Sequence, residues 1–206
     1  MNYKLYYAPG SAAMGVRLIL EEIGVPYELI PSTIDMDSPR PAEQLAINPN
    51  GWLPVLLYDD NAMYECAAIT VFLCDRHPQS ALAPAIDDPL RGLFLQTLVY
   101  FSSSIQNAFQ LTYYPQRFAD TAADEPGAQR RGNRRLRETW QIINHQIGHR
   151  QWILGDQFSA ADIYCYMLTT WLKPSKGHPE LSEFPNVSRI ADKVRNRPCT
   201  QRVFAQ

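Results

Sequence analysis

The sequence lacks an excess of charge of either sign and lacks any long apolar run. Its 206 residues carry 19 Lys and Arg against 21 Asp and Glu, for a formal net charge of −2. This balance does not favour nucleic acid or an anionic membrane as the main partner. No apolar run approaches the ~18 residues of a membrane-spanning helix, and no basic start followed by an apolar core indicates a signal peptide. We therefore expect a cytoplasmic protein with no membrane partner.

Several common site motifs are also missing. The sequence has no G-x-G-x-x-G and no P-loop, which argues against a nucleotide site. The segment "HQIGH" places His145 and His149 four residues apart, but Gln146 stands where a zinc-protease helix has glutamate, and no third ligand is evident. We expect no metal. The cysteines are widely spaced and form no C-x-x-C pair, so free thiols are expected: Cys66, Cys74, Cys165 and Cys199.

Residues 1–80 show the patterns of strands and helices in alternation. Aromatic and β-branched residues predict strands at 3–8, 26–30, 53–59 and 62–65. Helical spacing of apolar residues predicts helices at 12–23, which Gly24 ends, and at 66–77. A stretch with short helical potential lies between the second and third strands. This order predicts a small mixed sheet with helices on its faces.

Beyond a linker at 79–87, rich in Pro, Ala and Asp, only helices are predicted. They span 90–113, 127–150, 160–172 and 187–197. The clearest start signal is "FSAADI", in which Ser159 and Asp162 form a capping box. Phe158 and Ile163 are placed to form the hydrophobic staple of the same helix. We expect an all-α second domain.

Four segments, in this order, resemble the cytosolic glutathione transferases, and in particular bacterial beta-like members. They are "KLYYAPG", "NPNGWLPVL", "ECAAI" and "GDQFSAADI". The resemblance covers nearly the whole chain. It implies an α/β thioredoxin-like N-terminal domain at 1–80, which binds glutathione, and an all-α C-terminal helical domain at 88–206. It also implies a homodimer, with glutathione as cosubstrate and Pro54 as a cis residue.

The resemblance places glutathione against Ser11, Trp52, Leu53, Pro54, Glu65 and Cys66. A bend at Pro54 would expose the backbone of Leu53 to an extended peptide. Glu65 could pair with the ligand's amine, and the N-terminus of the helix at 66–77 could bind a carboxylate. Glu65 could instead only stabilise its own helix, Pro54 could be a trans edge-strand proline, and Cys66 could be a redox thiol. Trp52 and Cys66 depart from the Lys or Gln and the Ser usual in the family.

The group that would activate the glutathione thiol is left open between two hydroxyls. The beta-type cysteine and the following serine fall on Ala12 and Ala13, which excludes mixed-disulfide chemistry through that cysteine. Serine-using members point to Ser11, and tyrosine-using members point to Tyr6. Ser11 is also a favoured helix cap, and Tyr6 could be a core aromatic.

The acceptor cleft is expected on the helix after the linker, at Gln106, Tyr113 and Tyr114. The beta-like branch has a His-Lys pair where this chain has Gln106 and Asn107. Tyr113 or Tyr114 could polarise an electrophile, although core or interface aromatics are the simpler interpretation. The basic run at 129–138 follows acidic residues, which favours a solvated helix face over a nucleic-acid site.

Together these features predict an enzyme that adds the glutathione thiolate to small hydrophobic electrophiles. Two alternatives remain: a non-catalytic glutathione-binding or regulatory protein, and a glutathione-dependent isomerase or peroxidase on the same fold. Trp52 and the missing cysteine favour the non-catalytic alternative, whereas Glu65 and the Pro54 segment oppose it.

Overall fold

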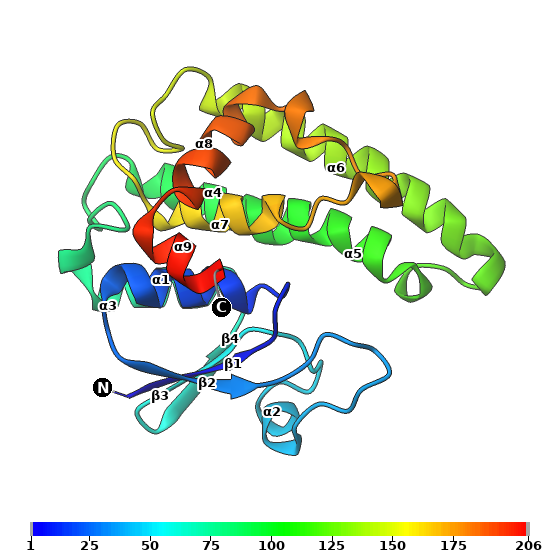
Figure 1. The fold of residues 1–206 in the computed structure, drawn as a ribbon, viewed down its shortest axis with the longest axis horizontal. Helices are drawn as coiled ribbons and strands as arrows, with labels where there is room; N and C mark the ends of the chain where they lie inside the picture. Colours follow the sequence, from blue (N-terminus) through cyan, green and yellow to red (C-terminus); the bar gives the residue numbers. More distant parts are fainter. Residues whose placement is uncertain (1, 205–206) are drawn as a thin grey trace. The chain divides into compact units, whose positions relative to one another are not determined.

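The computed structural model describes residues 2–204 (Figure 1). The contacts among these residues form two compact units, one that runs up to Asp88 and resumes at Asn196, and one that spans Pro89–Arg195. The boundaries expected from the sequence, 1–80 and 88–206, remain a prediction. The contacts place residues 196–204 with the first unit.

The first unit contains a four-stranded mixed sheet in the order β2-β1-β3-β4. The strands are β1 Tyr3–Tyr7, β2 Tyr27–Pro31, β3 Val55–Tyr58 and β4 Asn61–Tyr64. β2 is parallel to β1, whereas β3 is antiparallel to both β1 and β4. The hairpin between β3 and β4 turns at Asp59, whose φ is 51°. The sheet expected from the sequence is confirmed.

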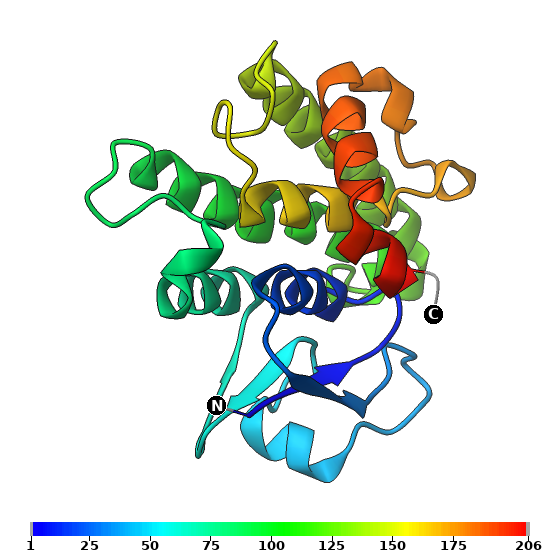
Figure 2. The ribbon, with the colours of Figure 1, turned by 60° about the vertical axis from the view of Figure 1, so that its left-hand side comes forward.

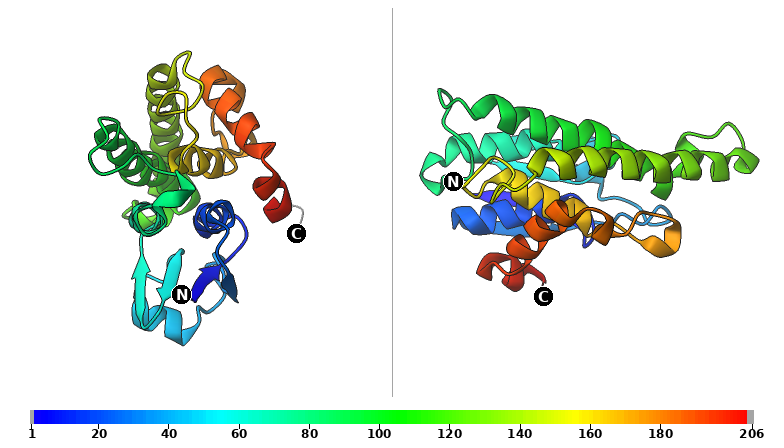
Figure 3. Two further views of the ribbon diagram at one scale, coloured as in Figure 1. Left: turned by 90° about the vertical axis from the view of Figure 1, so that its left-hand side faces the viewer. Right: turned by 90° about the horizontal axis from the view of Figure 1, so that it is seen from above.

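Helices cover both faces of this sheet, as the left view of Figure 3 shows. α1 (Ala13–Ile23) and α3 (Cys66–Arg76) lie on one face, and α2 (Ala42–Ile47) lies on the other. The Tyr3 hydroxyl is 2.8 Å from His77 Nε2 at the end of α3, which anchors β1 to that helix. α1 ends at Gly24, whose φ of 77° is the left-handed conformation that glycine adopts without strain.

The chain returns to the first unit in a helix that the sequence did not reveal. The expected helix at 187–197 is α8 (Pro185–Arg195), and a further helix, α9 (Pro198–Phe204), follows it. Pro198 ends one helix and begins the next, because proline fits the first helical position as well as the break. Arg197 donates to both carboxylate oxygens of Glu22 at 2.7 Å, and α9 lies beside α1 (Figure 2).

The second unit is helical throughout. The helix expected at 90–113 is α4 (Arg91–Tyr100), a π-helical stretch η2 (Phe101–Gln106) and α5 (Asn107–Tyr113), which continue one another. The helix expected at 127–150 is α6 (Glu125–Ile147). Short 3-10 turns complete the described chain: η1 Pro78–Ser80 in the first unit, and η3 Pro115–Arg117, η4 Ala122–Asp124, η5 Pro174–Lys176 and η6 Leu181–Glu183 in the second.

α7 (Ala160–Thr169) is the core of the second unit, and all ten of its residues are buried. Its capping box is confirmed: Asp162 Oδ2 accepts from Ser159 N–H at 2.8 Å and from Ser159 Oγ at 3.0 Å. Asp162 Oδ1 accepts from Ile153 N–H at 2.9 Å. Burial raises the pKa of Asp162 to about 6. Phe158 packs against Trp152, with ring centroids 5.0 Å apart. Among residues 2–204, no helix is long and apolar enough to cross a membrane.

Candidate functional site

The turn between β1 and α1 uses Ser11 to hold its own backbone. Ser11 is 5% exposed. Its hydroxyl donates to Ala8 C=O at 2.7 Å and accepts from Ala13 N–H at 3.2 Å. A serine hydroxyl has one proton to donate, and here that proton is already in a hydrogen bond. In this conformation the Ser11 hydroxyl therefore stabilises the backbone of its own turn.

A backbone amide in the same turn is left unpaired. Gly10 N–H donates to Met14 Sδ at 3.1 Å, and Ala13 N–H donates to Ser11 Oγ. Ala12 N–H has no acceptor among the described residues. Because every residue but proline carries an amide, no side-chain motif could have revealed this donor. It lies at the N-terminus of α1, where the helix dipole favours negative charge.

Tyr6 lies in β1 with its side chain 5% exposed, paired in register with Ile30 and Val55. Its hydroxyl makes no hydrogen bond with any residue of 2–204. Alternation along the strand puts Tyr6 on the face opposite to Tyr7. Tyr7 faces α1, since the guanidinium carbon of Arg17 is 5.3 Å from the Tyr7 ring centroid. Tyr6 therefore lies on the face of the sheet opposite to the one that α1 covers.

The segment before β3 offers a free backbone edge. The Leu53–Pro54 peptide bond is cis, as the resemblance implied. Within residues 2–204, neither the N–H nor the C=O of half-buried Leu53 makes a hydrogen bond. Asn48 Nδ2 donates to Trp52 C=O at 3.1 Å and so fixes the approach to Leu53. Such an edge can pair with an extended peptide as an added strand.

Glu65 precedes α3 with an unusual backbone. Its φ is 76° and its ψ is 111°, in a region that residues with a Cβ rarely adopt. Conformations of this kind cost on the order of 1–3 kcal/mol and cluster at functional sites. The exposed carboxylate makes no hydrogen bond or ion pair with the described part of the chain. The backbone therefore holds an unpaired anion at the N-terminus of α3 at a cost in stability.

Cys66 connects the start of α3 to the turn before α1. Its side chain is 4% exposed, and its Sγ donates to Ala12 C=O at 3.6 Å. This contact brings Ala12 and Glu65 to the same part of the first unit. A buried thiol in this position packs rather than reacts, which argues against the redox interpretation of Cys66.

The residues expected in the acceptor cleft all lie in the second unit. The Tyr113 hydroxyl donates to Trp171 C=O at 2.6 Å, and burial raises the pKa of Tyr113 to about 12. Tyr113 therefore has no free proton with which to polarise an electrophile. Gln106 Oε1 accepts a hydrogen bond from the Tyr164 hydroxyl. The guanidinium carbon of Arg117 lies 4.4 Å from the Tyr114 ring centroid.

The part of the chain between residues 2 and 204 contains no group of three His, Cys, Asp or Glu side chains that could hold a metal ion.

Comparison with known proteins identifies the family of both units. Residues 5–81 match the glutathione S-transferase N-terminal domain, and residues 101–198 match the glutathione S-transferase C-terminal domain. The chain is 29% identical to the uncharacterized GST-like protein YncG of Escherichia coli K12, over 98% of this chain and 96% of the relative. It is 26% identical to glutathione S-transferase GstA of Escherichia coli O157:H7, over 96% and 95%.

A solved structure gives the same result. The sphingomonad glutathione S-transferase complexed with glutathione is 25% identical, covers 98% of this chain and 97% of its own, and superposes with a TM-score of 0.84. Sequence, domain matches and fold agree along nearly the whole chain, and the protein belongs to the glutathione S-transferase family.

Proposed function

We propose that this protein binds glutathione in its first unit and transfers the glutathione thiolate to small electrophiles. The observation that carries the proposal is Glu65, whose unpaired carboxylate is held on a strained backbone at the N-terminus of α3. Nothing within the described chain uses this charge. An ammonium group on a ligand would, and glutathione carries one.

The surrounding residues suit the rest of the tripeptide. The free N–H and C=O of Leu53 match the donor and acceptor of an extended cysteinyl residue. The first amides of α3, from Cys66 onward, match the carboxylate beside the ligand's amine. The exposed Trp52 offers an apolar face in place of the Lys or Gln usual in the family. The glutathione bound to the sphingomonad relative supports glutathione as the ligand.

The thiol activation that we propose uses the backbone. A free thiol has a pKa of ~8.5, and lowering it by two units requires about 2.7 kcal/mol in favour of the thiolate. A hydrogen bond from the unpaired amide of Ala12 and the dipole of α1 would together stabilise the thiolate by a free energy of this order. Ser11 would have to release Ala8 before donating to sulfur. Tyr6 remains the alternative side-chain donor, since its hydroxyl is unpartnered among residues 2–204.

In the reaction, the thiolate sulfur attacks an electron-poor carbon and forms a C–S bond. The bond from that carbon to a leaving group such as chloride breaks, and the leaving group departs with the electron pair. The thiol proton passes to solvent when the thiolate forms. No other co-reactant is required.

Steady-state conjugation of glutathione to 1-chloro-2,4-dinitrobenzene tests the proposal. We expect saturation in glutathione, and we expect Glu65→Gln to raise KM for glutathione at least about tenfold, the effect of losing one charge-assisted hydrogen bond. Tyr6→Phe and Ser11→Ala are the matched hydroxyl variants and should keep most of the activity. No turnover above the uncatalysed rate by the wild-type protein would contradict the enzymatic proposal.

A second candidate is a glutathione-binding protein without transferase activity. The Ser11 hydroxyl favours this second candidate, because its proton is already donated to Ala8 C=O and is not available to a ligand. Glutathione binding without turnover on any of several electrophiles would support this candidate. An isomerase or peroxidase on the same scaffold would instead turn over its own substrate class.

We also infer a homodimer, on the strength of the family resemblance and one exposed apolar pair. Leu95 and Val99 lie one turn apart on α4 and are 38% and 59% exposed. Sedimentation analysis should give twice the chain mass of 23.5 kDa, and Val99→Asp should shift it toward the monomer. A wild-type monomer would exclude this assembly.

A further inference from the structure

Two buried carboxamide side chains of the first unit fix the backbone that leads to Leu53. Gln44 lies in α2 and is 0% exposed, and Asn48 directly follows α2 and is 3% exposed. Gln44 Nε2 donates to Gly51 C=O at 3.2 Å. Asn48 Nδ2 donates to Trp52 C=O at 3.1 Å. The backbone carbonyls of the two residues before Leu53 are therefore both paired.

Asn48 also shapes the turn between α2 and β3. Its Oδ1 accepts from Asn50 N–H at 3.3 Å, and its backbone C=O accepts from Gly51 N–H at 2.8 Å. Gly51 has a φ of 69°, which glycine adopts without strain. A Cβ on Gly51 would lie 3.2 Å from both Arg40 Cγ and Leu45 Cδ2. The turn is thus closely packed as well as hydrogen-bonded.

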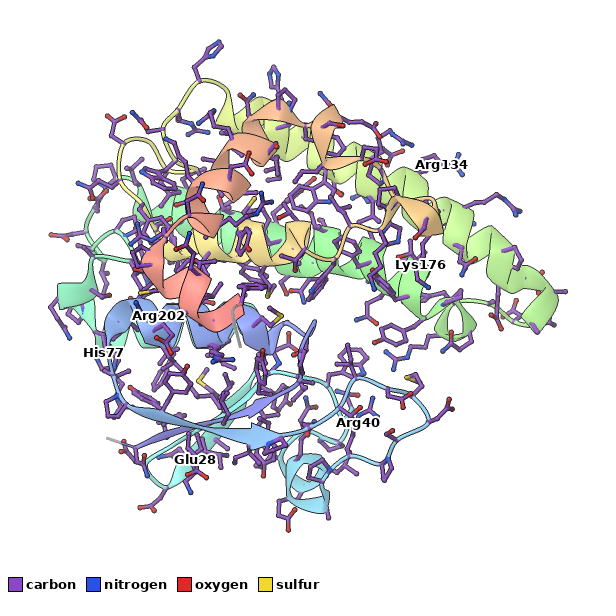
Figure 4. All side chains as sticks on the ribbon, in the orientation of Figure 1. Glu28, Arg40, His77, Arg134, Lys176 and Arg202 are labelled. Atoms are coloured by element: carbon purple, nitrogen blue, oxygen red, sulfur yellow. The ribbon has the colours of Figure 1, made fainter. Side chains whose placement is uncertain are left out.

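The same hydrogen-bond network reaches the end of β1. Ser32 Oγ donates to Gln44 Oε1 at 2.5 Å, and Ser32 N–H donates to Tyr7 C=O at 2.8 Å. Arg40, on the segment that leads from β2 into α2 (Figure 4), donates from Nε to Gly51 C=O at 3.4 Å. Gln44 therefore connects the end of β1 to the turn before β3.

Leu53 is the residue at which this network stops and the backbone becomes open. Its N–H and C=O make no hydrogen bond within residues 2–204, and the cis Pro54 and then β3 follow it. Paired polar groups in a buried network restrain one another. A ligand that pairs with Leu53 thus meets a backbone already in place, so that binding does not have to order it.

We propose that Gln44 and Asn48 are positioning residues for glutathione, because they hold the N–H and C=O of Leu53 where the cysteinyl residue of the ligand pairs with them. Both side chains are buried, so each acts through the backbone of residues 51–53. This inference rests on the glutathione binding of the proposed function. It deepens that function by naming residues that set the affinity without touching the ligand.

The test uses two ligands with a blocked thiol, S-methylglutathione and its depsipeptide, in which an ester oxygen replaces the cysteinyl N–H. The depsipeptide cannot donate to Leu53 C=O. Calorimetric titration of the whole protein gives the ratio of its Kd to that of S-methylglutathione. The wild-type ratio should be about five, the effect of one neutral hydrogen bond. In Asn48→Ala and in Gln44→Met the ratio should fall to about two, because Leu53 is no longer held against the ligand.

S-methylglutathione itself should bind both variants about fivefold more weakly, because Leu53 must then be ordered on binding. Ser32→Ala is a milder variant that removes only the hydrogen bond to Gln44 Oε1. It should change the ratio in the same direction by a smaller amount. A ratio that stays at the wild-type value in all three variants would overturn the inference, since a purely structural role weakens both ligands equally.

Asn144→Ala is the matched control. Asn144 is also a buried asparagine that fixes a distant backbone, with Oδ1 accepting from Asn186 N–H at 2.8 Å, but it belongs to the second unit. Its substitution should lower stability to a similar extent and leave both Kd values unchanged. A ratio that falls equally in N144A would overturn the inference, because the effect would then follow from lost stability. Circular dichroism would verify that each variant is folded.

The same titrations separate this inference from the proposed function. If the wild type binds neither ligand, the proposed glutathione site fails and the inference fails with it. If the wild type binds both ligands equally, the pairing with Leu53 fails, and the inference is overturned while glutathione binding stands. If the ratios change as expected but no electrophile is turned over, only the transferase proposal fails. In an active enzyme, N48A and Q44M should raise KM for glutathione and leave kcat unchanged, because neither residue touches a reacting atom.

Discussion

The backbone of Glu65 gives the sharpest prediction. In most helical positions, replacing alanine by glycine lowers stability by roughly 0.5–1 kcal/mol, because glycine loses more conformational freedom on folding. At position 65 the order should reverse. The φ of 76° and ψ of 111° suit glycine and strain every residue with a Cβ. Glycine at this position would relieve roughly 1–3 kcal/mol of backbone strain, which outweighs the conformational entropy that glycine loses on folding.

We therefore expect Glu65→Gly to unfold at higher urea concentration than Glu65→Ala, with a difference of about 1 kcal/mol in the free energy of unfolding. Both variants lose the carboxylate at the α3 N-terminus, whose contribution of roughly 0.3–1 kcal/mol then cancels in the comparison. Both should lose glutathione affinity to a similar extent. The assay is urea denaturation followed by tryptophan fluorescence, with calorimetry for binding.

A Glu65→Gly protein less stable than Glu65→Ala would refute the strain argument. A Glu65→Gly protein that binds glutathione as well as the wild type would refute the role of the carboxylate. The two results are independent, so the experiment separates the backbone's contribution from the side chain's.

Three further predictions concern stability and the turn between β1 and α1. Ser11→Ala should cost about 1 kcal/mol of stability, because it removes the hydrogen bonds of a buried hydroxyl to Ala8 and Ala13. Ultraviolet titration should find the pKa of the bound glutathione thiol unchanged; a rise in that pKa would identify Ser11 as its hydrogen-bond donor. The raised pKa of Asp162, about 6, makes its carboxyl stabilising when protonated. Its contribution is complete below the unfolded pKa near 3.8 and is lost as pH rises through about 6, by roughly 3 kcal/mol in all. Urea midpoints of wild type relative to Asp162→Asn should fall over that interval, and a flat difference would contradict the burial argument. Gly132→Ala should destabilise the protein by about 1–3 kcal/mol, because the added Cβ would lie 2.7 Å from Thr112 Cγ2. Gly127 has room for a Cβ, so Gly127→Ala should stabilise the protein by up to ~1 kcal/mol. Thermal denaturation that ranks the two variants the other way would show that α5 and α6 are not closely packed.

The sequence predicted those parts of the fold that local patterns determine. The spacing of apolar residues predicted β1, α1 and the hairpin of β3 and β4, and Gly24 predicted the end of α1. Ser159 and Asp162 predicted the capping box of α7. α9 was not predicted because Pro198 was taken only as the end of the preceding helix. The contacts that stabilise α9, such as that between Arg197 and Glu22, join residues far apart in the chain. The π-helical turn of η2 also has no local signal.

The candidate site divides in the same way. Sequence motifs predicted the cis bond at Pro54 and the position of Glu65. Hydrogen-bond geometry, which the sequence does not show, determines that the Ser11 proton is donated to Ala8 and that the amide of Ala12 is unpaired. Whether Ser11 or Tyr6 takes part in catalysis stays a prediction.

The most direct test of the central claim is calorimetric titration of the whole protein with glutathione and with N-acetylglutathione, whose amine cannot be protonated. We predict saturable binding of glutathione and binding of the acetylated ligand that is at least about tenfold weaker, because the ammonium group that would pair with Glu65 is gone. The same comparison in Glu65→Gln should show little difference between the two ligands. No detectable heat with millimolar glutathione, or equal binding of both ligands by the wild type, would contradict it.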